Sequence, residues 1–173
     1  MITIVSGTNR KNSRSLVLSK YYFNLLSEKG IEAQILDLNL LPADFAFNAL
    51  YENSGKHEDF NEFRQTVEQS NKFIFVVPEY NGSFPGVLKT FIDGLKYPDS
   101  FTGKKAMLVG ISSGMQGGAL ALSHLNDILN YLNMNVFGTR FKIPLIESKF
   151  NGSFTDPKLE ELAKIQIEGF LKF

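Results

Sequence analysis

The sequence of 173 residues lacks cysteine altogether and contains only two histidines. Without thiols the chain can form no disulfide, zinc–thiolate site or iron–sulfur cluster, and it has no cysteine nucleophile. The histidines, His57 and His124, lie far apart in the sequence, and neither has a second ligand at a metal-binding spacing. We therefore interpret both as surface histidines or as histidines with ordinary hydrogen-bond partners, and we predict no metal site.

The chain also lacks an excess of charge of either sign, because 18 Lys and Arg residues balance 18 Asp and Glu residues. This balance gives no electrostatic reason to expect binding to nucleic acid or to an anionic membrane surface. No apolar run approaches the roughly 18 residues that span a bilayer. The first expected strand begins at Ile2, which leaves no room for a signal peptide, so we expect a cytoplasmic protein.

Strand patterns alternate with helical patterns along the chain, whose length suits one domain over residues 1–173. This alternation predicts an α/β fold, a doubly wound five-stranded parallel sheet in the order 2-1-3-4-5 between two helical layers. Residues 40–56 are expected to pack over the sheet rim, and residues 139–153 show no clear period. The expected strands are 2–6, 33–38, 73–77, 104–111 and 135–138, and the expected helices are 13–29, about 60–67, and those after Pro85, Gly118 and Asp156.

A polar loop, SGTNRKNSRS at residues 6–15, follows the first expected strand. It leads into a helix, and a helix start offers unpaired backbone N–H groups to an anion. Arg10 can donate two N–H bonds to phosphate oxygens. The loop matches neither the Walker A nor the GxGxxG pattern, so a single phosphate suits it best. The alternative is a polar turn in which Ser13 only caps the helix. Further hydroxyl donors in the loop are Ser6, Thr8 and Ser15.

A second loop follows the central strand, whose apolar run at 73–77 predicts burial on both faces. Pro78 ends the run, since proline cannot donate to a sheet. A tyrosine and an asparagine in this position could stack on a flat heterocycle and hydrogen-bond to it. The alternative is a proline–glycine turn with an incidental aromatic residue. The residues that follow Pro78 are Glu79, Tyr80, Asn81, Gly82 and Ser83.

The third loop, SSGMQGG at residues 112–118, follows the fourth expected strand. Gly114 and Gly117 let the backbone pass close to a planar ligand, and Ser112 and Ser113 offer donors. The alternative is a flexible turn. Because the three loops follow strands one, three and four of a parallel sheet, we expect them to converge at one edge, where open α/β sheets bind ligands.

These residues resemble the NAD(P)H-dependent FMN reductase family, the flavodoxin-like group that includes small quinone, azo-dye and chromate reductases. The resemblance covers about residues 1–140, and its most specific block is PEYNGSFPGVLK at residues 78–89. The other blocks are SGTNR at 6–10 with Ser13 and Ser15, and Ser113-Gly114 with Gly117-Gly118. Thr8 stands where the family has serine and Ser15 where it often has asparagine, and both keep a donor.

The resemblance implies bound FMN, with the phosphate held by the first loop, mainly by Ser6, Arg10, Ser13 and Ser15. The 78–82 loop would border the isoalloxazine ring and ribityl chain, and residues 112–118 would approach the other edge of the ring. A hydride would pass from NADPH or NADH through FMN to a quinone, azo compound, nitroaromatic or free flavin in a ping-pong mechanism. No side chain is expected to act as acid or base, and we interpret Glu79 as structural.

Two other functions are compatible with the sequence. An electron-transfer or redox-sensing flavoprotein would lack a site for a hydride donor, but many such carriers are strongly acidic and this chain is neutral. A flavin-free interaction protein would have no use for the hydroxyls and Arg10 of the first loop. The resemblance implies a homodimer, possibly a tetramer, and the aromatic residues around Tyr97 are either core or an exposed patch.

Overall fold

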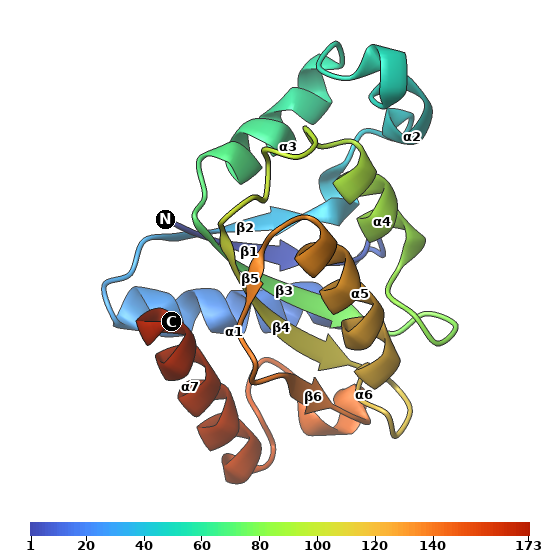
Figure 1. The fold of residues 1–173 in the computed structure, drawn as a ribbon. Helices are drawn as coiled ribbons and strands as arrows, with labels where there is room; N and C mark the ends of the chain where they lie inside the picture. The colour runs from blue at the N-terminus through green and yellow to red at the C-terminus, as the bar shows by residue number, and fades with distance from the viewer.

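The computed structural model describes residues 1–173 as a parallel sheet with helices on both faces (Figure 1). The sheet order is β2-β1-β3-β4-β5, with β6 also paired to β4, so the predicted order 2-1-3-4-5 is confirmed. All strand pairs are parallel. The strands are β1 (Ile2–Ser6), β2 (Ala33–Asp37), β3 (Lys72–Pro78), β4 (Lys105–Ile111), β5 (Asn135–Val136) and β6 (Phe141–Ile143).

Two short strands, β5 and β6, occupy the fifth position of the sheet, where we predicted one continuous strand. β5 pairs with Lys105–Ala106 of β4, whereas β6 pairs with Val109–Ile111 further along the same strand. Between them the carbonyl of Leu108 accepts a hydrogen bond from Nε2 of Gln166 at 3.0 Å, and the same amide donates to the carbonyl of Thr139 at 2.8 Å. A buried side chain thus replaces the missing strand bond, because buried backbone groups need partners.

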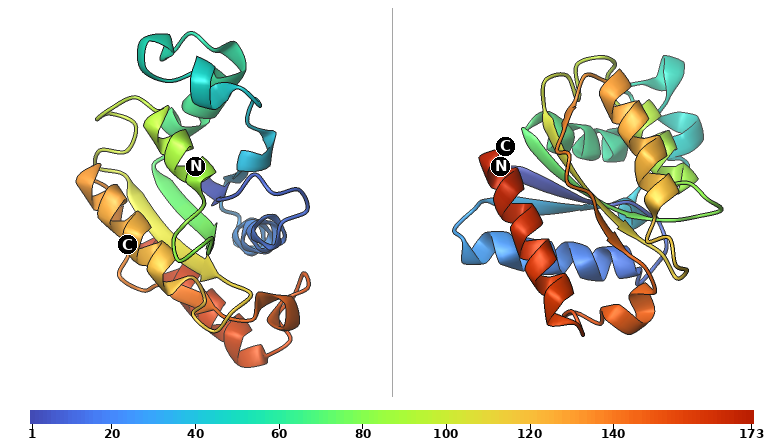
Figure 2. Two further views of the ribbon diagram at one scale, coloured as in Figure 1. Left: turned by 90° about the vertical axis from the view of Figure 1, so that its right-hand side faces the viewer. Right: turned by 60° about the horizontal axis from the view of Figure 1, so that its bottom comes forward.

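The helices form two layers, one on each face of the sheet (Figure 2). On one face, α1 and α7 pack on a core that includes Ile4, Ile74 and Val109. On the other face, α3, α4 and α5 pack on a core that includes Phe75 and Leu108. Successive side chains of each strand point to opposite faces of the sheet, and helices cover both faces. The strands therefore consist of near-continuous apolar runs. The helices are α1 (Arg14–Glu28), α3 (Glu58–Glu68), α4 (Gly86–Asp93), α5 (Ala119–Tyr131) and α7 (Pro157–Lys172).

The remaining segments contain short helices. The connection over the sheet rim contains η1 (Leu38–Leu40), α2 (Phe45–Asn48) and η2 (Tyr51–Asn53), and the segment without a clear period contains α6 (Ile146–Lys149). The ring of Phe45 stacks on that of Phe60 at 5.5 Å between centroids, which confirms that this connection packs on the fold. None of the helices has the length and apolar character that a membrane crossing requires.

Local sequence signals set the helix ends. The carboxylate of Asp156 accepts from the backbone N–H of Lys158 at 2.9 Å, and Pro157 occupies the first turn of α7, as predicted. Gly30 follows the C-cap of α1 with φ of 69°, the left-handed conformation that glycine adopts without a Cβ penalty. At its other end, α1 begins at Arg14, directly after the polar loop that follows β1, with Ser13 as its N-cap.

Candidate functional site

A cleft of about 410 Å³ lies where the loops after β1, β3 and β4 meet. Parallel strands bring these three loops to one edge of the sheet, although they are far apart in sequence (Figure 1). The segment after β6 completes the wall of the cleft. The lining residues are Thr8, Arg10, Lys11, Asn12, Ser13, Arg14, Ser15, Pro78, Glu79, Tyr80, Ile111, Ser112, Ser113, Ile146 and Glu147.

The loop after β1 ends at the N-terminus of α1 with several donors that have no partner. Ser13 caps the helix, since its Oγ accepts from the backbone N–H of Leu16 at 3.1 Å, and it also lines the cleft. The backbone N–H groups of Arg14 and Ser15 have no acceptor in the chain. The hydroxyl of Ser15 is buried and also lacks a partner. Unpaired donors at a helix start, together with the helix dipole, favour a bound anion here.

Three cationic side chains, Arg10, Lys11 and Arg14, line this part of the cleft. Glu147 lies nearby, and its carboxylate accepts a hydrogen bond from Oγ of Ser113 at 2.7 Å. That bond is the main cause that holds the pKa of Glu147 below its ordinary value, and the charges of Arg14 and Arg10 lower the pKa further. The arginines therefore act electrostatically across the cleft, where they would favour an anionic ligand.

The loop after β3 is a tight hairpin. Tyr80 and Ser83 exchange two backbone hydrogen bonds, of 2.8 and 3.1 Å. Between them Asn81 and Gly82 have φ of 51° and 76°, the pair of positive values that a type I′ turn requires and that Asn-Gly favours. The hydroxyl of Tyr80 lies 2.8 Å from Oγ1 of Thr8, so the hairpin is joined to the first loop across the cleft.

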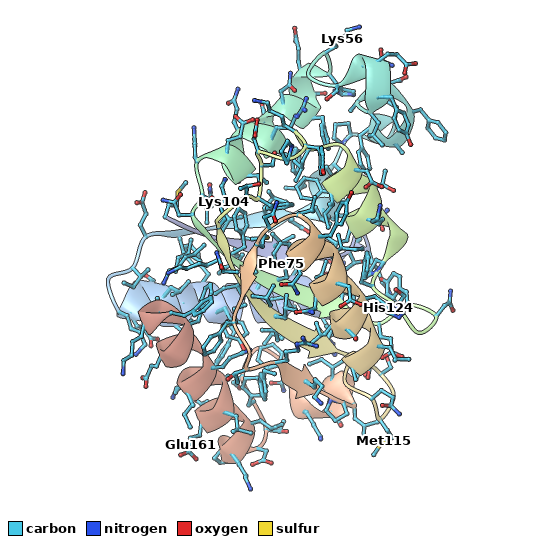
Figure 3. The ribbon with its side chains drawn as sticks, viewed as in Figure 1. Lys56, Phe75, Lys104, Met115, His124 and Glu161 are labelled. Carbon is cyan, nitrogen blue, oxygen red and sulfur yellow. The ribbon has the colours of Figure 1, made fainter.

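Further contacts fix this hairpin to the elements beside it. The backbone N–H of Glu79 donates to the carbonyl of Ile111 at 3.0 Å, at the ends of two paired strands. The hydroxyl of Ser83 lies 2.9 Å from Nδ1 of His124, and Figure 3 shows His124 on α5. One carboxylate oxygen of Glu79, Oε2, is buried without a partner beside the cleft. The position of the hairpin is therefore set by neighbours on both sides.

The loop after β4 is braced by its own groups and rests on the sheet. Oγ of Ser112 donates to the carbonyl of Gly114 at 2.9 Å and accepts from the backbone N–H of Gly117 at 2.8 Å. A Cβ atom at Gly110 would lie 2.5 Å from the carbonyl oxygen of Gly117, so only glycine in β4 allows the loop to lie this close. The hydroxyl of Ser112 is thus used for structure.

The structure brings nine of the fourteen predicted site residues into the cleft lining, while their roles in binding remain predictions. Asn81 and Gly82 instead form the hairpin turn, and Gly114 and Gly117 shape the third loop. Ser6 is the last residue of β1, and its buried hydroxyl has no partner. The nine lining residues are Thr8, Arg10, Ser13, Ser15, Pro78, Glu79, Tyr80, Ser112 and Ser113.

A fourth segment of the cleft, which contributes Ile146 and Glu147, was not predicted from the sequence. This segment follows β6, a strand of three residues that is too short to show a period. The one sequence signal for β6 was the alternation of apolar Phe141 and Ile143 with polar Lys142. It matches the structure, in which the two apolar side chains are buried and the lysine is exposed. The other lining residues that we had not assigned to the site are Lys11, Asn12, Arg14 and Ile111.

The arrangement suits a mononucleotide with a flat head. Unpaired donors and cations gather at the start of α1, and the ring of Tyr80, which is 37% exposed, lies across the same cleft. No group of three or more His, Asp and Glu side chains could hold a metal ion. The cleft can therefore bind and orient a phosphorylated heterocycle, and the buried, unpartnered hydroxyl of Ser15 fits the phosphate of FMN.

Comparison with known proteins gives a consistent result. Residues 1–147 match the protein family described as NADPH-dependent FMN reductase. An NAD(P)H-dependent FMN reductase from Pseudomonas aeruginosa is 28% identical over 169 residues, which cover 95% of this chain and 89% of that protein. A quinone reductase from Pseudomonas putida is 29% identical over 136 residues, which cover 77% of this chain and 71% of that protein.

Solved structures agree with the sequence matches. A flavoenzyme NAD(P)H:(acceptor) oxidoreductase from Paracoccus denitrificans superposes with a TM-score of 0.79 at 26% identity, over 99% of this chain and 94% of that one. A flavodoxin from the domain Archaea superposes with a TM-score of 0.64 at 14% identity, over 99% of this chain and 98% of that one. The second likeness concerns the fold alone, and it agrees with the predicted flavodoxin-like architecture.

Proposed function

The chain belongs to the NADPH-dependent FMN reductase family and is an oxidoreductase, and from this premise we propose that it binds FMN in the cleft and reduces a small acceptor with NADPH or NADH. Bound FMN would supply the redox chemistry, hydride transfer between nicotinamide and an acceptor. The side chains of the protein hold and orient the cofactor, and none of them needs to act as an acid or a base.

The observation that carries this proposal is the set of unpaired donors at the start of α1. The backbone N–H groups of Arg14 and Ser15 lack acceptors, and the buried hydroxyl of Ser15 lacks a partner. Unsatisfied buried donors are costly, so a site that keeps them is one that a ligand completes. Arg10 adds a guanidinium that can donate two hydrogen bonds to phosphate oxygens.

The hairpin and the third loop are proposed to hold the isoalloxazine ring. The ring of Tyr80 lines the cleft, and the backbone N–H groups of Ser113 and Gly114 have no acceptor in the chain. Backbone donors fixed beside a heterocycle stabilise negative charge that develops on it. Asn81, Gly82, Gly114 and Gly117 act here by shaping the two loops, because their backbone conformations or bonds define the turns.

The acceptor is proposed to be a quinone or a similarly flat compound, in line with the name of the relative from Pseudomonas putida. A flat acceptor and nicotinamide can use the same open side of the cleft in turn, because both stack on a flat ring. Alternating use of one opening predicts ping-pong kinetics. Parallel double-reciprocal plots for NADPH and a benzoquinone test this mechanism, and intersecting lines contradict it.

We also propose that the protein forms a homodimer through the face made by α4 and α5. A groove of about 500 Å³ lies between these helices, with seven hydrophobic residues among the thirteen that line it. Tyr97 and Tyr131 stack at 6.4 Å at this groove and are 67% and 73% exposed. An apolar groove with exposed aromatic rings favours a protein partner. Sedimentation at micromolar concentration tests the state, and a monomer contradicts it.

Anaerobic titration of the purified, FMN-loaded protein with NADPH and then NADH tests the main proposal. Loss of the yellow absorption on addition of stoichiometric NADPH, and its return on addition of a quinone, is the expected result. A protein that takes up FMN but is not reduced by either nucleotide would instead be an electron carrier or redox sensor. A protein that takes up no FMN would contradict the cofactor assignment.

A further inference from the structure

The segment after β6 forms a fourth part of the flavin cleft and is tied to the third loop by several hydrogen bonds. The backbone N–H of Leu145 donates to the carbonyl of Gly114, and that of Ile146 to the carbonyl of Ser112, both at 3.0 Å. Leu145 has φ of 52°, a left-handed conformation that costs energy in a leucine. Such a conformation persists only where the surrounding structure holds it, and here it starts α6 beside the cleft.

Glu147, in the first turn of α6, makes the one side-chain hydrogen bond between the segment after β6 and the third loop. Its Oε1 accepts from Oγ of Ser113 at 2.7 Å, a short distance that is typical of a charge-assisted bond. Both residues line the cleft, and no ion pair with Arg10 or Arg14 shorter than 4.0 Å competes for the carboxylate. The carboxylate is therefore engaged with the third loop.

The same loop has unpaired backbone donors at Ser113, which lines the cleft, and at its neighbour Gly114. The backbone N–H groups of Ser113 and Gly114 have no acceptor, whereas the hydroxyls of Ser112 and Ser113 are both used in internal bonds. This loop can therefore offer a ligand its backbone N–H groups. How strongly such donors stabilise negative charge on a ligand depends on how firmly they are held. Ser113 is solvent-exposed, so without its bond to Glu147 the peptide groups at 113 and 114 would be held less firmly.

We propose that Glu147 is a positioning residue of the flavin site, which holds Ser113 so that the unpaired N–H groups of the third loop stay fixed beside the isoalloxazine ring. The inference rests on the proposed function, since the ring belongs to FMN. Fixed donors favour the more negative, reduced cofactor over the oxidised one. The bond between Glu147 and Ser113 therefore raises the midpoint potential of the bound flavin, without contact between Glu147 and the reacting atoms.

Two measurements on the full chain test this role. In the flavin-free protein, Glu147→Ala and Ser113→Ala are each expected to speed hydrogen exchange in residues 112–118, and the double variant is expected to add nothing further. In the FMN-loaded protein, Ser113→Ala, which breaks the same bond but keeps the carboxylate charge, is expected to weaken binding of reduced relative to oxidised flavin about three- to tenfold. For a two-electron couple this change corresponds to a midpoint potential lower by about 15 to 30 mV.

Two variants serve as controls. Glu147→Gln keeps an oxygen acceptor for Ser113 and is expected to restore wild-type exchange, whereas a Gln variant that exchanges as fast as Ala overturns the proposal. Glu161→Ala removes an exposed carboxylate on α7, away from the cleft (Figure 3), and is expected to change neither hydrogen exchange nor the midpoint potential. Unchanged exchange in Glu147→Ala also overturns it. Wild-type protein that binds no FMN would refute the cofactor assignment separately, because the exchange measurement needs no flavin.

Discussion

The hydroxyl groups of Thr8 and Tyr80 lie 2.8 Å apart across the cleft, although 72 positions separate the two residues in the sequence. The contact joins the loop after β1, where the donors for a phosphate gather, to the hairpin after β3, which borders the proposed ring site. It also gives the exposed ring of Tyr80 a fixed hydroxyl. A single hydrogen bond thus connects the two ends of the proposed FMN site.

Removing this contact should weaken cofactor binding. Tyr80→Phe keeps the ring but loses the bond to Thr8, and a neutral hydrogen bond contributes about 1 kcal/mol, so FMN affinity should fall about fivefold. Thr8→Ala should have a similar effect, and the double variant should show less than the sum because both changes remove one interaction. Fluorescence titration with FMN measures these affinities, and fully additive losses would contradict the coupling.

Arg10→Ala should weaken FMN binding about 10- to 100-fold, the effect of losing one charge-assisted pair of about 1.5 to 3 kcal/mol. Riboflavin lacks the phosphate, so its affinity should not change in the same variant. Lys20→Ala removes an exposed cation on α1 that does not line the cleft, and it provides the matched control. Equal losses for FMN and riboflavin would show that Arg10 does not contact the phosphate.

Gln166→Ala should destabilise the fold strongly. The side chain is 1% exposed, donates to the carbonyls of Leu108 and Thr139, and accepts from the hydroxyl of Tyr22 at 3.3 Å. Truncation leaves these groups without partners, and each unsatisfied buried group costs about 1 to 3 kcal/mol. We expect a loss of about 3 kcal/mol in urea unfolding. Gln34→Ala, on the edge strand β2, is the control and should cost much less.

Two adjacent tyrosines should respond in opposite directions to loss of their hydroxyl. The hydroxyl of Tyr21 is buried without a partner, so Tyr21→Phe should stabilise the protein by about 1 kcal/mol at neutral pH. The hydroxyl of Tyr22 donates to Gln166, so Tyr22→Phe should destabilise it by a similar amount. Thermal unfolding of both variants tests the contrast, and a destabilised Tyr21→Phe would show that this hydroxyl has a partner in solution.

The stability of the protein should also fall at high pH. Burial is the main cause that raises the pKa of Tyr21 to about 12, and the nearby charges of Glu160 and Glu28 add to it. The Tyr21 phenol is neutral in both the folded and the unfolded state below pH 10, the ordinary value, so it causes no pH dependence there. Because its folded-state pKa is raised, the folded protein loses stability relative to the unfolded chain as pH rises from 10 towards 12. Tyr21→Phe should reduce this loss between pH 10 and 12, measured as the change in urea midpoint.

The sheet order and three of the loops of the cleft could be predicted because long apolar strands and helical periods carry strong signals. The runs at β3 and β4 have buried side chains on both faces, so their positions are clear in the sequence. The roles of Asn81 and Gly82 were less clear, because an Asn-Gly pair serves a hairpin turn as readily as a ligand.

The divided fifth strand and the residues after it could not be predicted. β5 and β6 contain two and three residues, lengths at which no period is detectable. The bond between Gln166 and Leu108 joins residues 58 positions apart, and a glutamine in a helical pattern reads as a surface residue. Glu147 was missed for the same reason, since its place at the cleft depends on where β6 pairs with β4.

The bond from Gln166 has a consequence for what can fold alone. The family match ends at residue 147, yet the amide that satisfies β4 comes from α7, beyond that boundary. A fragment cut at the limit of the match would leave Leu108 without this partner and would uncover the apolar surface that α7 shields. Engineering of this protein, such as the exchange of cofactor-binding loops between relatives, should therefore keep α7 together with the sheet.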